Sequence, residues 1–207
     1  MERMNMTTTN LRLALATAAL LSTAAAQAVT VVDTGTPSNQ PPFGYALDAV
    51  DYVAGEVDFA NATQVASVAA HILGGTAGDS FTVALYADSG AHAPTGSALY
   101  TATASYTADG WNGVSGLNWA VSTGAYWVAL EIGANDTLSS GFENVVLDHG
   151  APKPLAFTAA ASGSGYSTTA SPMSFGLQVT AVPEPSSCLL MLAGLAGVGG
   201  LSRRQRA

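Results

Sequence analysis

This chain of 207 residues has almost no cysteine, and its central part has almost no basic residues. The only cysteine, Cys188, lies in an apolar run near the C-terminus, so the central part has neither a disulfide nor a thiol nucleophile. Of 14 acidic residues, all but Glu2 lie between 29 and 185, where Lys153 is the only base and the net charge is about −12. Such a surface repels phosphate backbones, which argues against nucleic-acid binding.

Long helical patterns are also missing between the two ends of the chain. Short runs rich in Val, Thr, Tyr and Trp alternate instead with turns marked by Gly and Asp. The expected strands are 52–59, 65–73, 81–86, 98–106, 116–121, 126–132, 144–147, 155–158 and 175–180. The side chains expected to face the core are Phe81, Val83 and Leu85 in one strand, and Tyr126, Val128, Leu130 and Ile132 in another. The pattern predicts an all-β fold, a single β-sandwich or jelly-roll-like domain at residues 29–181.

Residues 1–28 have the pattern of a secretory signal peptide. Arg3 and Arg12 come before an apolar stretch that ends at Ala26, and Ala26 and Ala28 flank Gln27 as small residues do at a signal cleavage site. Cleavage by signal peptidase after Ala28 would make Val29 the first residue of the mature chain. The alternative is a buried N-terminal helix.

Residues 182–207 form a tail in three parts. Val182, Pro183, Glu184 and Pro185 come first, an apolar run of about 14 residues follows from 188 to 201, and a basic end closes the chain. We expect the two prolines to stop any strand and to leave an exposed linker. The run makes about 21 Å of helix, short for a hydrocarbon core of about 30 Å. The basic end, Arg203, Arg204 and Arg206, should stay in the cytoplasm, which places the central domain outside the inner membrane.

This order of motif, short membrane helix and basic end resembles the PEP-CTERM sorting signal of Gram-negative bacteria. The resemblance covers about the last 25 residues. It implies a membrane-tethered precursor that faces the periplasm and is recognised and processed by an exosortase. Hosts of this family typically make exopolysaccharide. The alternative is an ordinary tail anchor, which the short and glycine-rich run does not favour.

The central domain has a weaker resemblance of its own. Residues 42–45 read Pro-Phe-Gly-Tyr, residues 81–88 are followed by Pro-Thr-Gly at 94–96, and 124–130 form a later strand-like segment. Together these segments look like the bacterial choice-of-anchor extracellular domains, in particular the variety labelled R. That family implies a location outside the cell and implies no reaction.

Catalytic motifs are incomplete. Glu56 and Asp58 resemble part of the Glu-x-Asp-x-x-Glu strand of jelly-roll glucanases, but Asn61 stands where the second glutamate would be. We therefore interpret the two acids as residues on the solvent face of an edge strand. His71, His92 and His149 lack the spacing of zinc ligands.

Calcium remains an alternative, because seven aspartates lie in or near expected turns, where they can equally accept turn hydrogen bonds. These are Asp48, Asp51, Asp79, Asp88, Asp109, Asp136 and Asp148. Trp111, in an expected loop, is the aromatic residue best placed for exposure. No cofactor, metal or catalytic residue is assigned.

The sequence thus predicts an exported, surface-sorted protein without enzymatic activity, associated with the cell envelope or with extracellular polysaccharide in an adhesion or biofilm-type role. Its expected partners are signal peptidase, the exosortase and the inner membrane before processing. The alternative is a jelly-roll lectin or glycan-active hydrolase that uses Glu56 and Asp58 or exposed aromatic residues.

Overall fold

The computed structural model describes residues 27–38, 44–138, 146–163 and 165–183. The chain divides into two compact units, and the described residues belong almost wholly to the unit Ala28–Glu184. Apart from Gln27, the other unit, Met1–Gln27 with Pro185–Ala207, lies outside the described residues. The predicted signal helix and transmembrane helix fall there.

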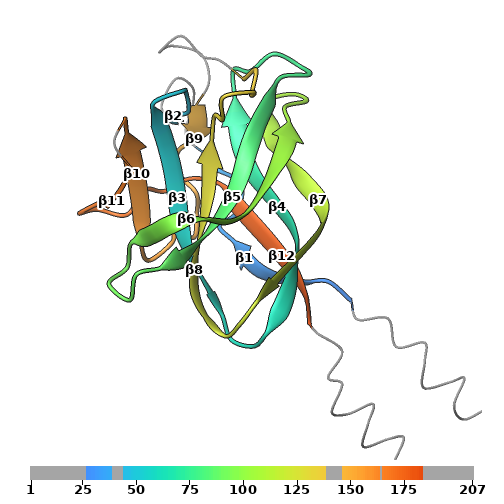
Figure 1. Ribbon diagram of the computed structural model, residues 1–207. Coiled ribbons are helices and arrows are strands. Elements are labelled where there is room, and N and C mark those ends of the chain that lie inside the picture. Colours follow the sequence, from blue (N-terminus) through green and yellow to red (C-terminus); the bar gives the residue numbers. More distant parts are fainter. Residues whose placement is uncertain (1–26, 39–43, 139–145, 164, 184–207) are drawn as a thin grey trace, which may run out of the picture. The chain divides into compact units, whose positions relative to one another are not determined.

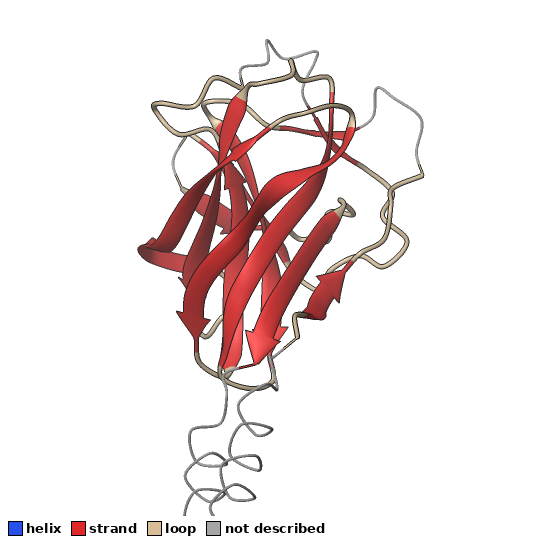
Figure 2. Ribbon diagram, turned by 90° about the vertical axis from the view of Figure 1, so that its right-hand side faces the viewer, coloured by secondary structure: helices blue, strands red, loops and turns tan. Residues whose placement is uncertain are grey.

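The described residues form strands and loops, with no helix among them (Figure 2). The twelve strands are β1 Val29–Asp33, β2 Gly44–Ala46, β3 Asp51–Phe59, β4 Thr63–Leu73, β5 Ser80–Asp88, β6 Pro94–Ser105, β7 Gly110–Val121, β8 Gly124–Glu131, β9 Val146–Asp148, β10 Thr158–Ser162, β11 Tyr166–Thr168 and β12 Leu177–Pro183. The prediction of an all-β fold is confirmed.

All strand pairs are antiparallel, and ten strands follow the order β1-β12-β4-β7-β6-β5-β8-β3-β10-β11, with β9 joining β2 to β4. The link between β7 and β6 is narrow, because it consists of the pair Ser105 and Gly113. Gly113 also pairs with Ala69, and a Cβ there would lie 2.1 Å from the Val68 carbonyl oxygen, so only glycine fits. Two groups of strands meet at this point, and in Figure 1 β12 and β4 pass behind β5, with β7 at the right-hand edge.

One hydrophobic cluster, which we call the main core, takes side chains from both groups of strands. Leu177 and Val179 of β12 and Val68 and Ile72 of β4 belong to it. So do Phe81, Val83 and Leu85 of β5 and Val128 and Leu130 of β8, all of them 0% exposed. Burial of each such side chain stabilises the fold by about 1.5–3 kcal/mol. The core-facing residues expected in these two strands are confirmed, with Ile132 at 8% exposure and Tyr126 packed at the margin.

Several strands differ from expectation. β7 begins at Gly110 and not near 116, so Trp111 lies in a strand, half-buried, with its ring 5.4 Å from that of His71. β10 begins at Thr158, where the expected strand 155–158 ends, because the residues that pair with β3 are 158–162. β2 and β11 have three residues each, too few for a period-2 pattern to show.

A second cluster lies on the opposite face of β3, β5, β8 and β10. It consists of Ala54, Ala84, Trp127, Ala129 and Ala159, each 0% exposed. Register explains the grouping, since Ala129 is paired with Ala54 on one side and Ala84 on the other, and Ala54 is also paired with Ala159. The small side chains leave room for Tyr86, Phe157 and Tyr166 to pack over them.

Candidate functional site

The two ends of the described chain lie next to each other. β1 runs antiparallel to β12, with Val29 opposite Ala181, so the predicted signal cleavage position after Ala28 adjoins the start of the tail. Ala28 is exposed and precedes the first strand. We call this part of the domain, formed by Ala28, Val29, Thr63, Val182 and Pro183, the tail end (Figure 1).

The strand β12 continues into the first two residues of the tail. Val182 pairs with Gln64 and Pro183 with Thr63 of β4, and the Thr63 hydroxyl donates a hydrogen bond of 2.7 Å to the Val182 carbonyl. The strand stops at the first proline, as expected, but Val182 and Pro183 belong to the sheet and not to the expected linker. Pro183 fits because it is the last residue of its strand, where its missing N–H interrupts no further pairing.

The other predicted sorting residues, Glu184, Pro185, Arg203, Arg204 and Arg206, lie outside the described residues, and so does Ala26. Within the described ranges, no helix is long and apolar enough to cross a membrane.

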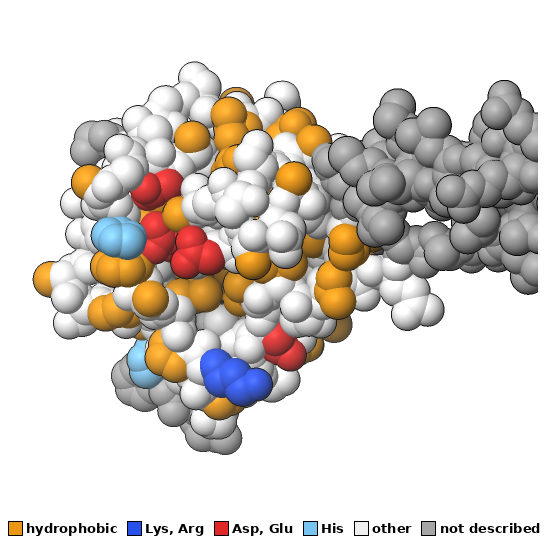
Figure 3. Space-filling view, turned by 90° about the horizontal axis from the view of Figure 1, so that it is seen from below, with side chains coloured by type: hydrophobic (Ala, Val, Ile, Leu, Met, Phe, Trp, Pro, Cys, Tyr) orange, Lys and Arg blue, Asp and Glu red, His pale blue; other side chains and the backbone are white. Residues whose placement is uncertain are grey.

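Acidic side chains gather on the outer side of the second cluster. Figure 3, seen from below, shows acidic side chains beside a histidine there. We call this surface the acidic face; its members are Glu56 and Asp58 of β3, Asp88 of β5 and Glu131 of β8. Asp58 is exposed, whereas Glu56 is only 9% exposed.

Glu56 is held by a histidine from a distant loop. Its two carboxylate oxygens each lie 3.0 Å from Nδ1 of His92, and the His92 ring stacks on Phe157 at 3.7 Å between ring centroids. His92 has a φ of 53°, a conformation rare for a residue with a side chain. β3 lies between β8 and β10, so the interpretation of Glu56 as a solvent-facing residue of an edge strand is wrong.

Asp88 anchors the loop that carries His92. Its carboxylate accepts bonds from the Trp127 indole at 2.9 Å, from the Gly90 amide at 2.6 Å and from the Ala93 amide at 3.0 Å. Burial pushes the pKa of Asp88 upward, but these hydrogen bonds together outweigh it and hold the pKa below its ordinary value. Ionised Asp88 thus links the loop to Trp127.

Glu131 accepts two tyrosine hydroxyls on one oxygen. Tyr86 donates at 2.8 Å and Tyr166 at 2.6 Å, and the two rings meet edge to face at 5.6 Å. Burial and the neighbouring Glu131 charge raise the pKa of both tyrosines above the ordinary value. Through these two hydrogen bonds, Glu131 links β11 and β5 to β8 over the alanines of the second cluster.

The carboxylates of Glu56 and Glu131 are not spaced as a glycosidase pair. Glu56 is opposite Trp127, and Glu131 lies four residues further along β8, which corresponds to about 13 Å. Glycosidase carboxyl groups lie about 5 to 9.5 Å apart. Both carboxylates are also engaged by His92 or by tyrosine hydroxyls.

Five of the candidate aspartates, Asp48, Asp79, Asp88, Asp109 and Asp136, accept hydrogen bonds from the protein itself. Asp48 accepts the Val50 and Asp51 amides, Asp109 the Gly74 amide and Asp136 the Gly133 amide. No three His, Cys, Asp or Glu side chains among the described residues come together as a metal site. His71, His92 and His149 lie in β4, in the loop before β6 and after β9, respectively.

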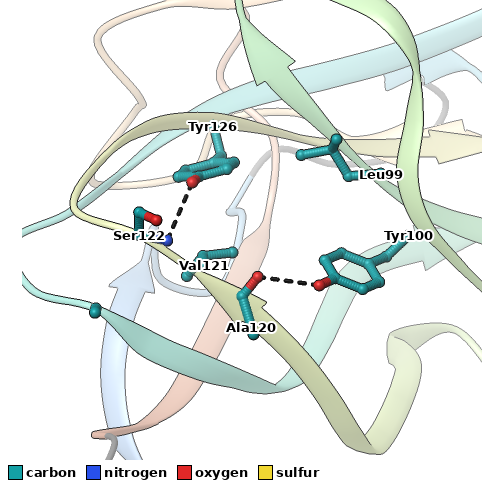
Figure 4. A pocket seen from close by; sticks show the side chains of 7 residues that line it. Leu99, Tyr100, Ala120, Val121, Ser122 and Tyr126 are labelled. Carbon is teal, nitrogen blue, oxygen red and sulfur yellow. Dashed lines mark hydrogen bonds between the residues drawn. The ribbon is translucent and has the colours of Figure 1, made fainter.

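A pocket of about 480 Å³ adjoins the tail end, because Val121 in its wall pairs with Thr63. Figure 4 shows Leu99, Tyr100 and Tyr126 around it. The Tyr126 hydroxyl oxygen accepts the Ser122 amide at 3.1 Å, and the Tyr100 hydroxyl donates to the Ala120 carbonyl at 3.2 Å. These bonds fix two aromatic rings at an open pocket.

Comparison with protein families finds a match to the PEP-CTERM protein-sorting motif at residues 181–207. The chain thus carries the sorting motif that its tail resembles, and the motif implies an exported, membrane-anchored precursor that an exosortase recognises and processes. The search of curated proteins finds no match.

Sequence reasoning missed the contacts that organise the acidic face. His92 is 36 residues from Glu56, and Tyr166 is 35 residues from Glu131, so no local spacing joins them. The available signal was the alternation in β8: Trp127 falls on the face opposite Val128, and a tryptophan on an outer face needs a cover.

Proposed function

We propose that this chain is a non-enzymatic surface protein. An N-terminal signal exports it, the tail holds it in the inner membrane with the domain in the periplasm, and an exosortase processes it. The mature protein then remains with the cell envelope or with extracellular polysaccharide, in an adhesion or biofilm-type role. The observation that carries this proposal is the sorting motif at residues 181–207.

The arrangement of the tail end supports the two membrane tethers. Val29 and Ala181 face each other on neighbouring strands, so a signal peptide before Ala28 and a tail after Pro183 would reach the same membrane surface. Neither tether would have to run along the domain. Signal peptidase and the exosortase would meet the same part of the protein.

Three finer interpretations belong to the same proposal. The main core, which takes side chains from both groups of strands, supports a sandwich of the jelly-roll type, as in the choice-of-anchor domains that the sequence resembles. The engaged carboxylates of Glu56 and Glu131 support the absence of hydrolytic activity. The apolar run at 188–201 supports a temporary membrane helix.

Fractionation of the native host with and without its exosortase tests the proposal. With the exosortase, the protein should leave the inner membrane for the envelope or the medium as a shortened species. Without it, the full precursor should stay in the inner membrane. The same distribution in both strains would contradict the proposal.

The second candidate function is glycan binding, and the pocket at Tyr100 and Tyr126 favours it, because fixed tyrosine rings can stack on sugars. Affinity electrophoresis in the host polysaccharide should then retard the mature protein, and Tyr100→Ala should abolish the retardation. Equal mobility with and without polysaccharide would dismiss this function.

A further inference from the structure

The sorting motif and the folded domain share three residues. The match to the motif begins at residue 181, and β12 ends at Pro183, so Ala181, Val182 and Pro183 belong to both. The matched segment therefore starts inside a sheet.

The attachment of β12 weakens toward its end. Ala181 lies between Val29 of β1 and Val65 of β4, whereas Val182 and Pro183 have partners on β4 alone. Proline has no N–H to donate. The Thr63 hydroxyl holds the Val182 carbonyl from a position that is only 7% exposed. Val182 and Pro183 are thus the part of β12 that detaches with the least loss of pairing.

An enzyme that processes the motif meets this attachment directly. Only four residues, 184–187, separate Pro183 from the apolar run, and they span at most about 14 Å. To act on a peptide bond near Pro185, the enzyme must take hold of the backbone around that bond. A backbone carbonyl or amide held by a neighbouring strand is not available for that purpose.

We propose that Val182 and Pro183 must leave β4 before the tail can be processed, and that Thr63 is the positioning residue that sets how often they do so. This inference rests on the proposed exosortase processing. The domain thereby slows its own release until the end of β12 opens. Loss of one hydrogen bond of ordinary strength shifts such an opening equilibrium about fivefold.

The test is a pulse-chase measurement of precursor conversion for the full chain in host cells that contain the exosortase. Thr63→Val removes the hydroxyl at nearly constant shape and should speed conversion about fivefold. Thr63→Ser keeps the hydroxyl and should restore the original rate. The matched control is Ser67→Ala, which removes the 2.6 Å bond to Thr180 between the same two strands, at the residue before the matched segment and inside the part of β12 that pairs on both sides. That variant should convert at the original rate.

A fourth variant leaves every residue of the sheet in place. It carries an insertion after Pro183 with the sequence Gly-Ser-Gly-Ser-Gly-Ser-Val-Pro. The original Val182 and Pro183 stay at the end of β12, and the second Val-Pro forms a complete Val-Pro-Glu-Pro motif away from the domain. This variant should convert faster than the natural chain, and Thr63→Val should then add nothing.

The outcomes separate the inference from the proposed function. If the natural chain is not processed in these cells, the proposed function fails. If it is processed but Thr63→Val leaves the rate unchanged or lowers it, the inference is overturned. A slower linker variant would also overturn it, because it would mean that the enzyme needs the folded tail end next to the motif.

Discussion

The tail end and the acidic face lie on one domain but differ in how they are held. At the tail end, the last two residues of β12 pair with one neighbour and are fixed by a single side-chain bond from Thr63. On the acidic face, Asp88 alone accepts three hydrogen bonds, and Trp127 beneath it is fully buried. The end of β12 can therefore detach with little loss of pairing, whereas the loop that carries His92 is held by several hydrogen bonds. Variants in one region should therefore alter processing, and variants in the other should alter stability.

The largest expected effect is on processing. Glu184→Ala, or deletion of Arg203 to Arg206, should leave an unprocessed precursor in the inner membrane, because each removes a part of the matched motif. Immunoblots of membrane fractions measure it. Asp58→Ala removes one exposed carboxylate of the acidic face and serves as the control that is processed normally. An equal defect in the control would remove the contrast between the two regions.

Trp127→Ala should cost the largest amount of stability, about 3–5 kcal/mol, because it removes a fully buried ring and the indole bond to Asp88. Urea unfolding of the purified mature protein measures this change. Trp111→Ala, at a half-buried tryptophan with one long bond of 3.4 Å, should cost clearly less. Similar losses in both variants would show that the second cluster adds little to the fold.

Acid should weaken the acidic face through Asp88. The pKa of Asp88 is lower in the folded protein than its ordinary value of 3.8, so its ionised form stabilises the fold above that pH. This contribution is lost as the pH falls below 3.8 through the folded pKa. The free energy of unfolding should therefore drop with acid in the natural protein and drop less in Asp88→Asn. Parallel acid profiles for the two proteins would exclude Asp88 as a source of the dependence.

The smallest effect should come from Tyr86→Phe. The change removes one of two hydroxyls that bind Glu131, and Tyr166 still donates to the same oxygen, so we expect a loss of about 1 kcal/mol. Urea unfolding measures the difference. A loss as large as that of Trp127→Ala would mean that the two hydroxyls act as one unit.

The sequence predicted the main core better than either functional region. Alternation in β5 and β8 identified Val83, Leu85, Val128 and Leu130 as buried, because a period of two fixes which side chains share a face. Trp127 lies on the other face of β8, where Tyr86, Phe157 and Tyr166 pack over the second cluster and Asp88 accepts the indole hydrogen bond. Such a cover depends on contacts between residues far apart in the sequence.

At the tail end, the sequence identified the motif, and the last strand runs two residues beyond the expected end of the domain. Proline in a strand usually marks an end, and the expected domain therefore stopped at 181. In the structure β12 ends at Pro183, whose partner on β4 is Thr63. The N–H that proline lacks would not be needed for any further pair. Nothing in the local pattern near Thr63 indicates that its hydroxyl reaches a carbonyl 119 residues later.

Mass spectrometry of the mature C-terminus tests the central claim most directly. Protein isolated from the envelope and the medium of exosortase-positive cells should end at or near Pro185 and lack the apolar run. A mature protein that still contains the peptide from Cys188 to Arg203 would contradict the account and would show that the tail is an ordinary anchor.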